Sequence, residues 1–247
     1  MSISIHSNSY EPLSSGYRIN RAADDAAGLS ISEKLKKNAT GLEVGSSNAR
    51  DGQSLINVAD GALGGIQDSL QRIYELGLRA SNGLYGDSEK QAIQMEINGL
   101  KEEIQNVAKS TNFNTVKLLD GSMADLQLAT NPEGGGLKIG LANSTLESLG
   151  IADFDVTGDF DLGAISDAMD RISTARSKLG AQYNRLDNTI AYNDYANYNV
   201  TAANSRIRDT DYAKESVNKN RDQVLQEYKL YMMKAKMNDN ACFLRLF

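Results

Sequence analysis

The chain has 247 residues, 40% of them hydrophobic and 23% charged, which is enough apolar material for one or two folded regions and excludes wholesale disorder. Its net charge is −6, its pI is about 5.0, and Lys and Arg are scattered along it, so nucleic acid is not an expected partner. With only 2 prolines and no tryptophan, the composition favours long helices over a thick globular core.

The sequence shows no disulfide framework, secretory leader or membrane span. Cys242 is the single cysteine, which also argues against a multi-cysteine metal site. No basic leader followed by an apolar run opens the chain, and no stretch approaches the roughly 20 apolar residues that cross a bilayer. We therefore expect no membrane insertion, and an export route without a cleaved leader if the protein leaves the cell.

Residues 1–21 are expected to be irregular, because Pro12 and Gly16 interrupt any helical period. After Asp24 and Asp25, whose carboxylates suit the positive end of a helix dipole, a long helix is expected to run to about Asn82. Its apolar face combines two sevenfold rows, one of Leu55, Ala62 and Leu76 and the other of Ala59, Ile66, Ile73 and Ala80.

Three glycines, Gly61, Gly64 and Gly65, lie inside this predicted helix. Each costs about 1 kcal/mol relative to alanine in a helix interior. The simplest explanation is close approach of another helix, and a local kink is the alternative.

A second helix is expected after Gly83 and Gly86, opened by a capping box of Ser88 and Gln91. Its apolar residues alternate spacings of four and three, which predicts that it folds back on the first helix. They are Ile93, Ile97, Leu100, Ile104 and Val107.

Between residues 121 and 161 the period changes to two, which predicts a β-hairpin packed against the helices. The alternating residues, on either side of a turn at 130–136, are Leu126, Leu128, Leu137, Ile139 and Leu141. Asp153 and Asp155 begin like a calcium loop, but Thr157 occupies its third ligand position and Ala164 its twelfth residue, so the match fails. Gly134–Gly136 are a flexible turn, since no Lys-Ser/Thr follows them.

A third long helix is expected from about Leu162, with an apolar seam at every seventh position. The seam residues are Ile165, Ile172, Leu179, Leu186, Val200 and Ile207, with Asn193 interrupting the row. At 1.5 Å per residue this seam is about 65 Å long, so it needs partner helices of matching length. A separate helix from Asp211 to about Asn240 carries its own apolar stripe.

These elements predict a mainly α protein, an elongated antiparallel helical rod of coiled-coil type with a small β-hairpin appendage, built to associate rather than to catalyse. The lone histidine, His6, and Cys242 lie near opposite ends, so a nucleophile pair is not expected. No catalytic residue, cofactor or metal site is predicted. The tyrosines Tyr183, Tyr192, Tyr195 and Tyr198 favour contacts between helices or subunits over stacking on a ligand, since no basic stripe accompanies them.

Several ordered segments closely resemble bacterial flagellins. They are Leu13–Asn20 and Ala23–Ile31, Phe113–Asn114 with Lys117–Gly121, Ser177–Gln182 with Asn184–Leu186, and Asn204–Asp211; the opening Met1–Ile5 is similar as well. The resemblance runs from about Leu13 to Thr210 in the correct order. It implies a subunit of the flagellar filament that polymerises with copies of itself or with other flagellins.

The same resemblance implies a domain organisation. Residues 1–21 would be a truncated inner domain and spoke, 22–120 the N-terminal half of the rod, 121–161 the hairpin region, 162–210 the C-terminal rod helix and 211–247 the inner-domain helix. Under this resemblance, the outer variable domains and most of the N-terminal inner helix of the family would be missing. Family members are exported through the flagellar apparatus without a cleaved signal peptide, and 211–247 would bind the export chaperone.

The resemblance further implies recognition by the animal innate immune receptor for flagellin. The matching positions are Leu70, Gln71, Arg72, Glu75, Leu76 and Glu96. Tyr74 stands where the family often has arginine, which predicts measurable but reduced receptor activation. The alternative for Arg72 and Glu75 is a solvated helix surface with ordinary local ion pairing.

Three functions follow from these observations. The first is a structural subunit of the extracellular filament that supports motility. Within the same fold, a junction protein between hook and filament is an alternative. A non-polymerising decoy that binds the chaperone or the host receptor is the alternative from another class.

Overall fold

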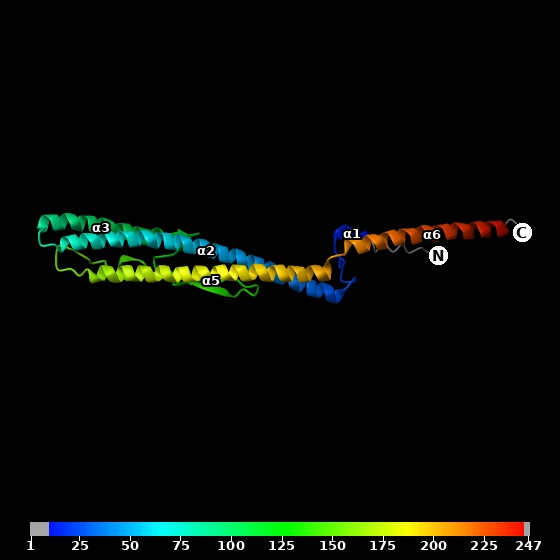
Figure 1. Cartoon of the computed structure of the whole chain (residues 1–247), viewed down its shortest axis with the longest axis horizontal. Coiled ribbons are helices and arrows are strands. Elements are labelled where there is room, and N and C mark those ends of the chain that lie inside the picture. The colour runs from blue at the N-terminus through cyan, green and yellow to red at the C-terminus, as the bar shows by residue number, and fades with distance from the viewer. Residues whose placement is uncertain (1–9, 245–247) are drawn as a thin grey trace. The chain divides into compact units, whose positions relative to one another are not determined.

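The computed structural model describes residues 10–244, with side chains described for 11–237. The described chain is mainly helical with two small antiparallel sheets, which confirms the predicted class (Figure 1). It divides into two compact units: unit 1 contains residues 1–39 and 197–247, and unit 2 contains residues 40–196. Met1–Ile5 and His6 lie outside the described residues, as does the side chain of Cys242.

Unit 2 is built on three long helices, α2 (Ala26–Ala80), α3 (Asp87–Ser110) and α5 (Gly163–Arg208), which lie alongside one another (Figure 1). The apolar rows predicted for the first helix are in its core, because a period near 3.6 keeps them on one face. From α3, Ile97 and Ile104 enter the same core. α3 therefore folds back on α2, as predicted, and the paired helices share one apolar interior.

The predicted β-hairpin is confirmed as β3 (Asp125–Ala129) and β4 (Gly136–Gly140), paired antiparallel with Leu126 opposite Ile139. Leu126, Leu128 and Leu137 pack against the core, and Ile139 is buried in it. Before this hairpin comes a smaller one, β1 (Asn112–Phe113) and β2 (Val116–Lys117), and after it the short helix α4 (Leu146–Leu149).

Two local predictions are wrong. A short helix, α1 (Tyr10–Ser15), lies within the segment expected to be irregular. The predicted capping box does not form, because α3 begins at Asp87 and Gly86 is its N-cap, which places Ser88 inside the helix. The Ser88 hydroxyl instead lies 3.2 Å from Oε2 of Glu89.

The expected close approach at Gly61, Gly64 and Gly65 is also wrong, because a Cβ at any of them would meet no atom within 4 Å. The alternative, a local kink, stays a prediction. Close approach occurs instead at three glycines nearer the start of α2, where the β3–β4 hairpin crosses the helix. They are Gly41, Gly45 and Gly52, whose neighbours in the hairpin are Pro132, Thr130 and Leu128 respectively. These glycines let the hairpin backbone lie directly against α2.

In unit 1, backbone hydrogen bonds join residues 16–18 to residues 208–210. The amide of Arg18 donates to the Arg208 carbonyl oxygen at 2.7 Å, and the amide of Thr210 donates to that of Gly16 at 3.0 Å. The Arg208 guanidinium lies 4.7 Å from the centre of the Tyr17 ring, a cation–π contact. The last helix, α6 (Tyr212–Leu244), follows directly.

Candidate interaction surfaces

The seam predicted on α5 is largely internal to the chain. Ile165, Ile172, Leu179 and Leu186 are buried, whereas Val200 and Ile207 are only half-buried. Where the row is interrupted, the buried Asn193 donates from Nδ2 to the Thr130 carbonyl oxygen at 2.9 Å. The buried part of this seam is therefore already occupied by α2 and the hairpin and offers no surface to a partner.

Polar ties that the sequence analysis missed fix α5 against α2. Arg176 donates from Nε to Asp60 Oδ1 at 2.8 Å and from Nη1 to Gln67 Oε1 at 2.9 Å. The hydrogen bond to Asp60 raises the pKa of Arg176, so its charge is secure. Asp194 accepts from Ser46 Oγ at 2.8 Å and Arg50 Nη2 at 3.0 Å. No local sequence signal pairs residues more than a hundred positions apart.

The structure separates the six expected receptor-contact residues into two groups. Leu70 and Leu76 are 0% and 2% exposed, so the expectation that these two side chains contact the receptor directly is wrong. The helical period explains it, since both lie on the face of α2 that carries Ile66 and Ile73 into the core. The other four residues lie outside the core, all but the half-buried Arg72 exposed.

Arg72 links these outer residues across α2 and α3. It donates to Glu96 Oε1 from Nη2 at 2.7 Å and from Nε at 3.0 Å, and from Nη1 to Glu75 Oε2 at 3.5 Å. The hydrogen bond to Glu96, more than the one to Glu75, raises the pKa of Arg72. Arg72 thus fixes the two glutamates beside it. We call Gln71, Arg72, Glu75 and Glu96 the α2–α3 surface.

The largest set of exposed apolar side chains lies on α6. Valine, leucine, tyrosine and methionine side chains along this helix are between 42% and 72% exposed. They are Val217, Val224, Leu225, Tyr228, Leu230, Tyr231, Met232, Met233 and Met237, together with Tyr212. Apolar exposure on this scale is typical of a segment that binds a partner.

The α5 tyrosines divide in the same way. Tyr183 packs against the core, whereas Tyr192, Tyr195 and Tyr198 are 68%, 71% and 74% exposed.

Within the described residues no group of His, Cys, Asp and Glu could hold a metal ion. In the segment that only begins like a calcium loop, Asp155 Oδ1 accepts hydrogen bonds from the amide and hydroxyl of Thr157, which lower the pKa of Asp155. Of the helices described, none is both long and apolar enough to cross a membrane.

Comparison with known protein families gives two matches that together span most of the chain. The bacterial flagellin N-terminal helical region matches residues 4–124, and the bacterial flagellin C-terminal helical region matches residues 162–246. These two matches flank the hairpin and its following loop.

Curated relatives match over nearly the whole chain. A flagellin of Halalkalibacterium halodurans is 42% identical over 224 residues, covering 88% of this chain and 82% of its own. A flagellin of Bacillus subtilis is 39% identical, with 88% and 84% covered. Flagellin FlaB1 of Treponema pallidum is 35% identical, with 94% and 88% covered.

Among solved structures, Bacillus cereus flagellin superposes with a TM-score of 0.52 at 25% identity, covering 60% of this chain and 88% of that one. A putative flagellar hook-associated protein from Vibrio parahaemolyticus superposes with a TM-score of 0.62 at 14% identity, covering 75% of this chain and all of that one. The second likeness concerns the fold alone.

Proposed function

The chain belongs to the bacterial flagellin family and is a structural subunit of the extracellular flagellar filament, not an enzyme; from this premise we propose that neighbouring subunits pack on the exposed apolar residues of α6. Flagellins assemble into filaments with other flagellin subunits, so each subunit needs surfaces that a single chain leaves open. The comparisons give no support to a decoy or a junction protein.

The observation that carries the α6 proposal is a sevenfold row of exposed apolar residues along this helix. Val217, Val224 and Tyr231 are 67%, 64% and 72% exposed and recur every seventh position. A sevenfold apolar row favours supercoiled packing against other helices. Burying a side chain of this size contributes roughly 1.5–3 kcal/mol, so such a row supports association.

The test is seeded polymerisation of the full chain. Filament fragments are added to purified protein, and the critical concentration is measured by pelleting. Val224→Asp is expected to raise that concentration at least about tenfold, because a carboxylate would have to be buried. Asn188→Asp adds the same charge at an exposed position of α5 and is expected to change the critical concentration by less than about twofold. A Val224→Asp protein that polymerises like the unmodified chain would overturn the proposal.

We propose that residues 211–247 also bind the flagellar export chaperone before assembly. An exposed apolar helix is prone to premature association, and a chaperone covering α6 would prevent it. Titration calorimetry of the chain with the chaperone of its own export system is expected to give one bound chaperone per chain. A Val224→Asp chain that binds it with unchanged affinity would contradict α6 as the contact.

Family membership supports two further proposals. Residues 22–120 and 162–210 would form the rod and 211–247 the inner-domain helix. Export would proceed without a cleaved signal peptide. The intact mass of filament protein tests the second, since removal of any N-terminal leader beyond Met1 would contradict it.

We propose the α2–α3 surface as the contact for the host innate immune receptor. Its charged residues are held in a fixed arrangement by Arg72, and fixed polar groups lose little entropy on binding. Tyr74, 37% exposed beside this cluster, supplies no positive charge, which supports a reduced response.

A reporter cell line that expresses the receptor measures this response. Arg72→Ala is expected to lower the potency of the chain, and Tyr74→Arg is expected to raise it. Lys109→Ala removes an exposed charge near the other end of α3 and serves as the control. No response to the unmodified monomer at any dose would contradict the proposal.

A further inference from the structure

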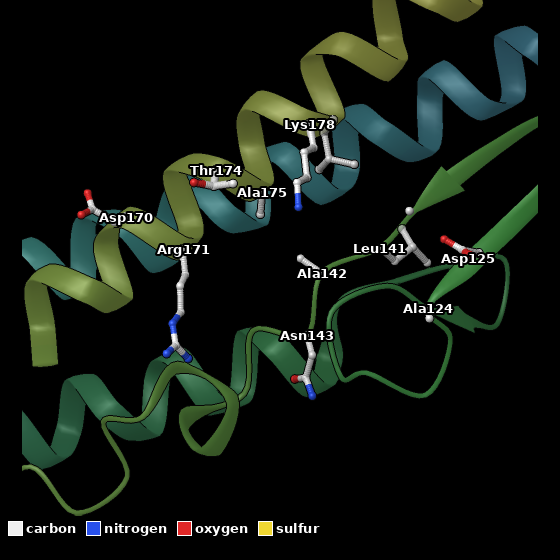
Figure 2. A pocket seen from close by; sticks show the side chains of 12 residues that line it. Ala124, Asp125, Leu141, Ala142, Asn143, Asp170, Arg171, Thr174, Ala175 and Lys178 are labelled. Atoms are coloured by element: carbon white, nitrogen blue, oxygen red, sulfur yellow. The ribbon is translucent and has the colours of Figure 1, made fainter.

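A groove in unit 2 runs between α5 and the segment that follows β4 (Figure 2). Its volume is about 490 Å³, and Leu141, Ala142, Ala175 and Leu179 supply apolar walls. This volume lies within the range that accommodates a bound side chain or small ligand. The groove takes no part in the surfaces described above.

Two basic side chains of α5 border the groove. Figure 2 shows the Lys178 ammonium directed into the space above Ala142, and in the described part of the chain Lys178 makes no ion pair or hydrogen bond. Arg171 is held along the border by donating from Nη1 to the Ser148 carbonyl oxygen at 2.6 Å, and it makes no ion pair with a described carboxylate. Asp125 and Asp170 also line the groove, and the Asp170 carboxylate points away from Lys178 (Figure 2).

A complementary protrusion exists elsewhere in unit 2, in the turn between α2 and α3. Leu84 is 88% exposed, more than any other large apolar side chain among the described residues. Its amide donates to Asn82 Oδ1 at 3.2 Å, which fixes the turn. Asp87 and Glu89 follow in the first turn of α3, so the apolar protrusion carries negative charge beside it.

This turn cannot reach the groove of its own chain. Arg176, two residues before Lys178, is bonded to Asp60, so the groove lies level with that part of α2. α2 continues for 20 residues from there to Ala80 before the turn begins, a length of about 30 Å. Any contact between protrusion and groove is therefore made by two different molecules.

We propose that the groove receives the α2–α3 turn of a second copy of the chain, with Leu84 seated between Leu141, Ala142 and Leu179. Asp87 and Glu89 of the incoming copy then face Lys178 and Arg171. Because the two surfaces differ, the contact is heterologous and leaves one turn and one groove free after each addition. It therefore propagates along a filament instead of closing a dimer, and it rests on the filament function stated above.

Charge exchange tests the contact in the full chain. Lys178→Glu and Asp87→Lys are each expected to raise the critical concentration for seeded polymerisation about tenfold or more, and the double variant is expected to return to within about threefold of the unmodified protein. Lys138→Glu, an exposed change of the same kind on β4, is the control. Circular dichroism verifies that every variant is folded. A Lys178→Glu critical concentration within about twofold of the unmodified value, or a double variant no better than the singles, would overturn the proposal.

Disulfide trapping gives a readout that does not require polymers. Two proteins, both carrying Cys242→Ser, hold either Leu84→Cys or Ala142→Cys, and they are mixed under oxidising conditions. We expect a cross-linked heterodimer from this pair and none when Ser54→Cys on the exposed face of α2 replaces Ala142→Cys. Polymers without the cross-link would overturn the contact, a cross-link without polymers would support the contact and count against the filament function, and the absence of both would overturn both.

Discussion

At the scale of single residues, the first small hairpin contains a strained threonine. Thr115 has φ of +72° and Asn114 has φ of +45°, both in the left-handed region. Asparagine tolerates this region, but a β-branched side chain does so only at a cost of about 1–2 kcal/mol. Two-residue hairpin turns of this kind prefer Asn-Gly, so glycine is the residue that the backbone favours at 115.

We expect Thr115→Gly to stabilise the chain by about 1 kcal/mol, measured as a shift in the midpoint of urea unfolding. Thr201→Gly makes the same substitution at an exposed position of α5, where the backbone is helical. It is expected to destabilise by roughly 0.5 kcal/mol, because glycine is a poorer helix former than threonine. Equal destabilisation by both changes would show that Thr115 is not strained.

Three aspartates predict how stability depends on pH. The pKa of Asp24 is lowered by the amides of Arg21 and Asn20, that of Asp120 by the hydroxyl and amide of Ser122, and that of Asp155 by the amide and hydroxyl of Thr157. A pKa lowered on folding gives stability that is present above the unfolded value, near 3.9, and is lost as pH falls through the folded value. Melting temperature should therefore decline below about pH 4.

Asp155→Asn is expected to make that acid-side decline shallower, because asparagine can still accept the Thr157 hydrogen bonds but does not titrate in this range. The measurement is the thermal unfolding midpoint between about pH 5 and pH 2.5. An unchanged slope in Asp155→Asn would contradict the role assigned to this carboxylate.

At the scale of elements, the β3–β4 hairpin is fixed to two helices at one point. The Thr130 carbonyl oxygen accepts from Asn193 of α5 and lies over Gly45 of α2. A Cβ at position 45 would overlap this backbone oxygen, which the strand pairing and Asn193 prevent from moving away. The Asn193 hydrogen bond thus fixes the hairpin to α5, and the absence of a side chain at Gly45 lets the hairpin backbone approach α2.

We expect Gly45→Ala to destabilise unit 2 by about 1–3 kcal/mol, since the overlap is with backbone and forces a shift. Gly61→Ala provides the matched control on the same helix, where a Cβ meets nothing within 4 Å. It should stabilise by up to about 1 kcal/mol, the ordinary gain of alanine over glycine in a helix. Urea unfolding followed by circular dichroism measures both, and two changes of the same sign would contradict this assignment.

The contrast between these glycines shows what the sequence could and could not predict. Sevenfold rows predicted α2, α3, α5 and their apolar faces, because burial on a helix face leaves a periodic trace. That period had already placed Leu76 on the apolar face, and it places Leu70, four residues after Ile66, there as well. In contrast, the sequence around Gly45 does not predict its contact with Thr130, and the sequence around Asp60 does not predict its ion pair with Arg176. Each contact depends on which distant segment the fold brings to that position. Asn193 interrupts the apolar row of α5, and only the structure explains it, because its side chain donates to the Thr130 carbonyl oxygen of the hairpin.

At the scale of the whole molecule, charge is distributed unevenly between the two units. Residues 40–196 hold 12 Lys and Arg against 22 Asp and Glu, whereas residues 1–39 and 197–247 hold 14 against 10. Unit 2 is therefore strongly acidic and unit 1 is basic. Copies of unit 2 brought together in a filament repel one another when they lie within about one electrostatic screening length.

Polymerisation should accordingly depend on ionic strength in a direction fixed by this repulsion. At about 20 mM salt, screening extends roughly 20 Å, so acidic units of neighbouring subunits repel, whereas at about 200 mM it falls below 10 Å. We expect the critical concentration of seeded assembly to fall between these two conditions. Close pairs such as Lys178 with Asp87 of the next copy are less affected, because their charges lie well within a screening length. A critical concentration that rises with salt would mean that attractive ion pairs between copies outweigh the net charge of unit 2, and the Lys178→Glu variant, lacking one such pair, would then lose part of that rise.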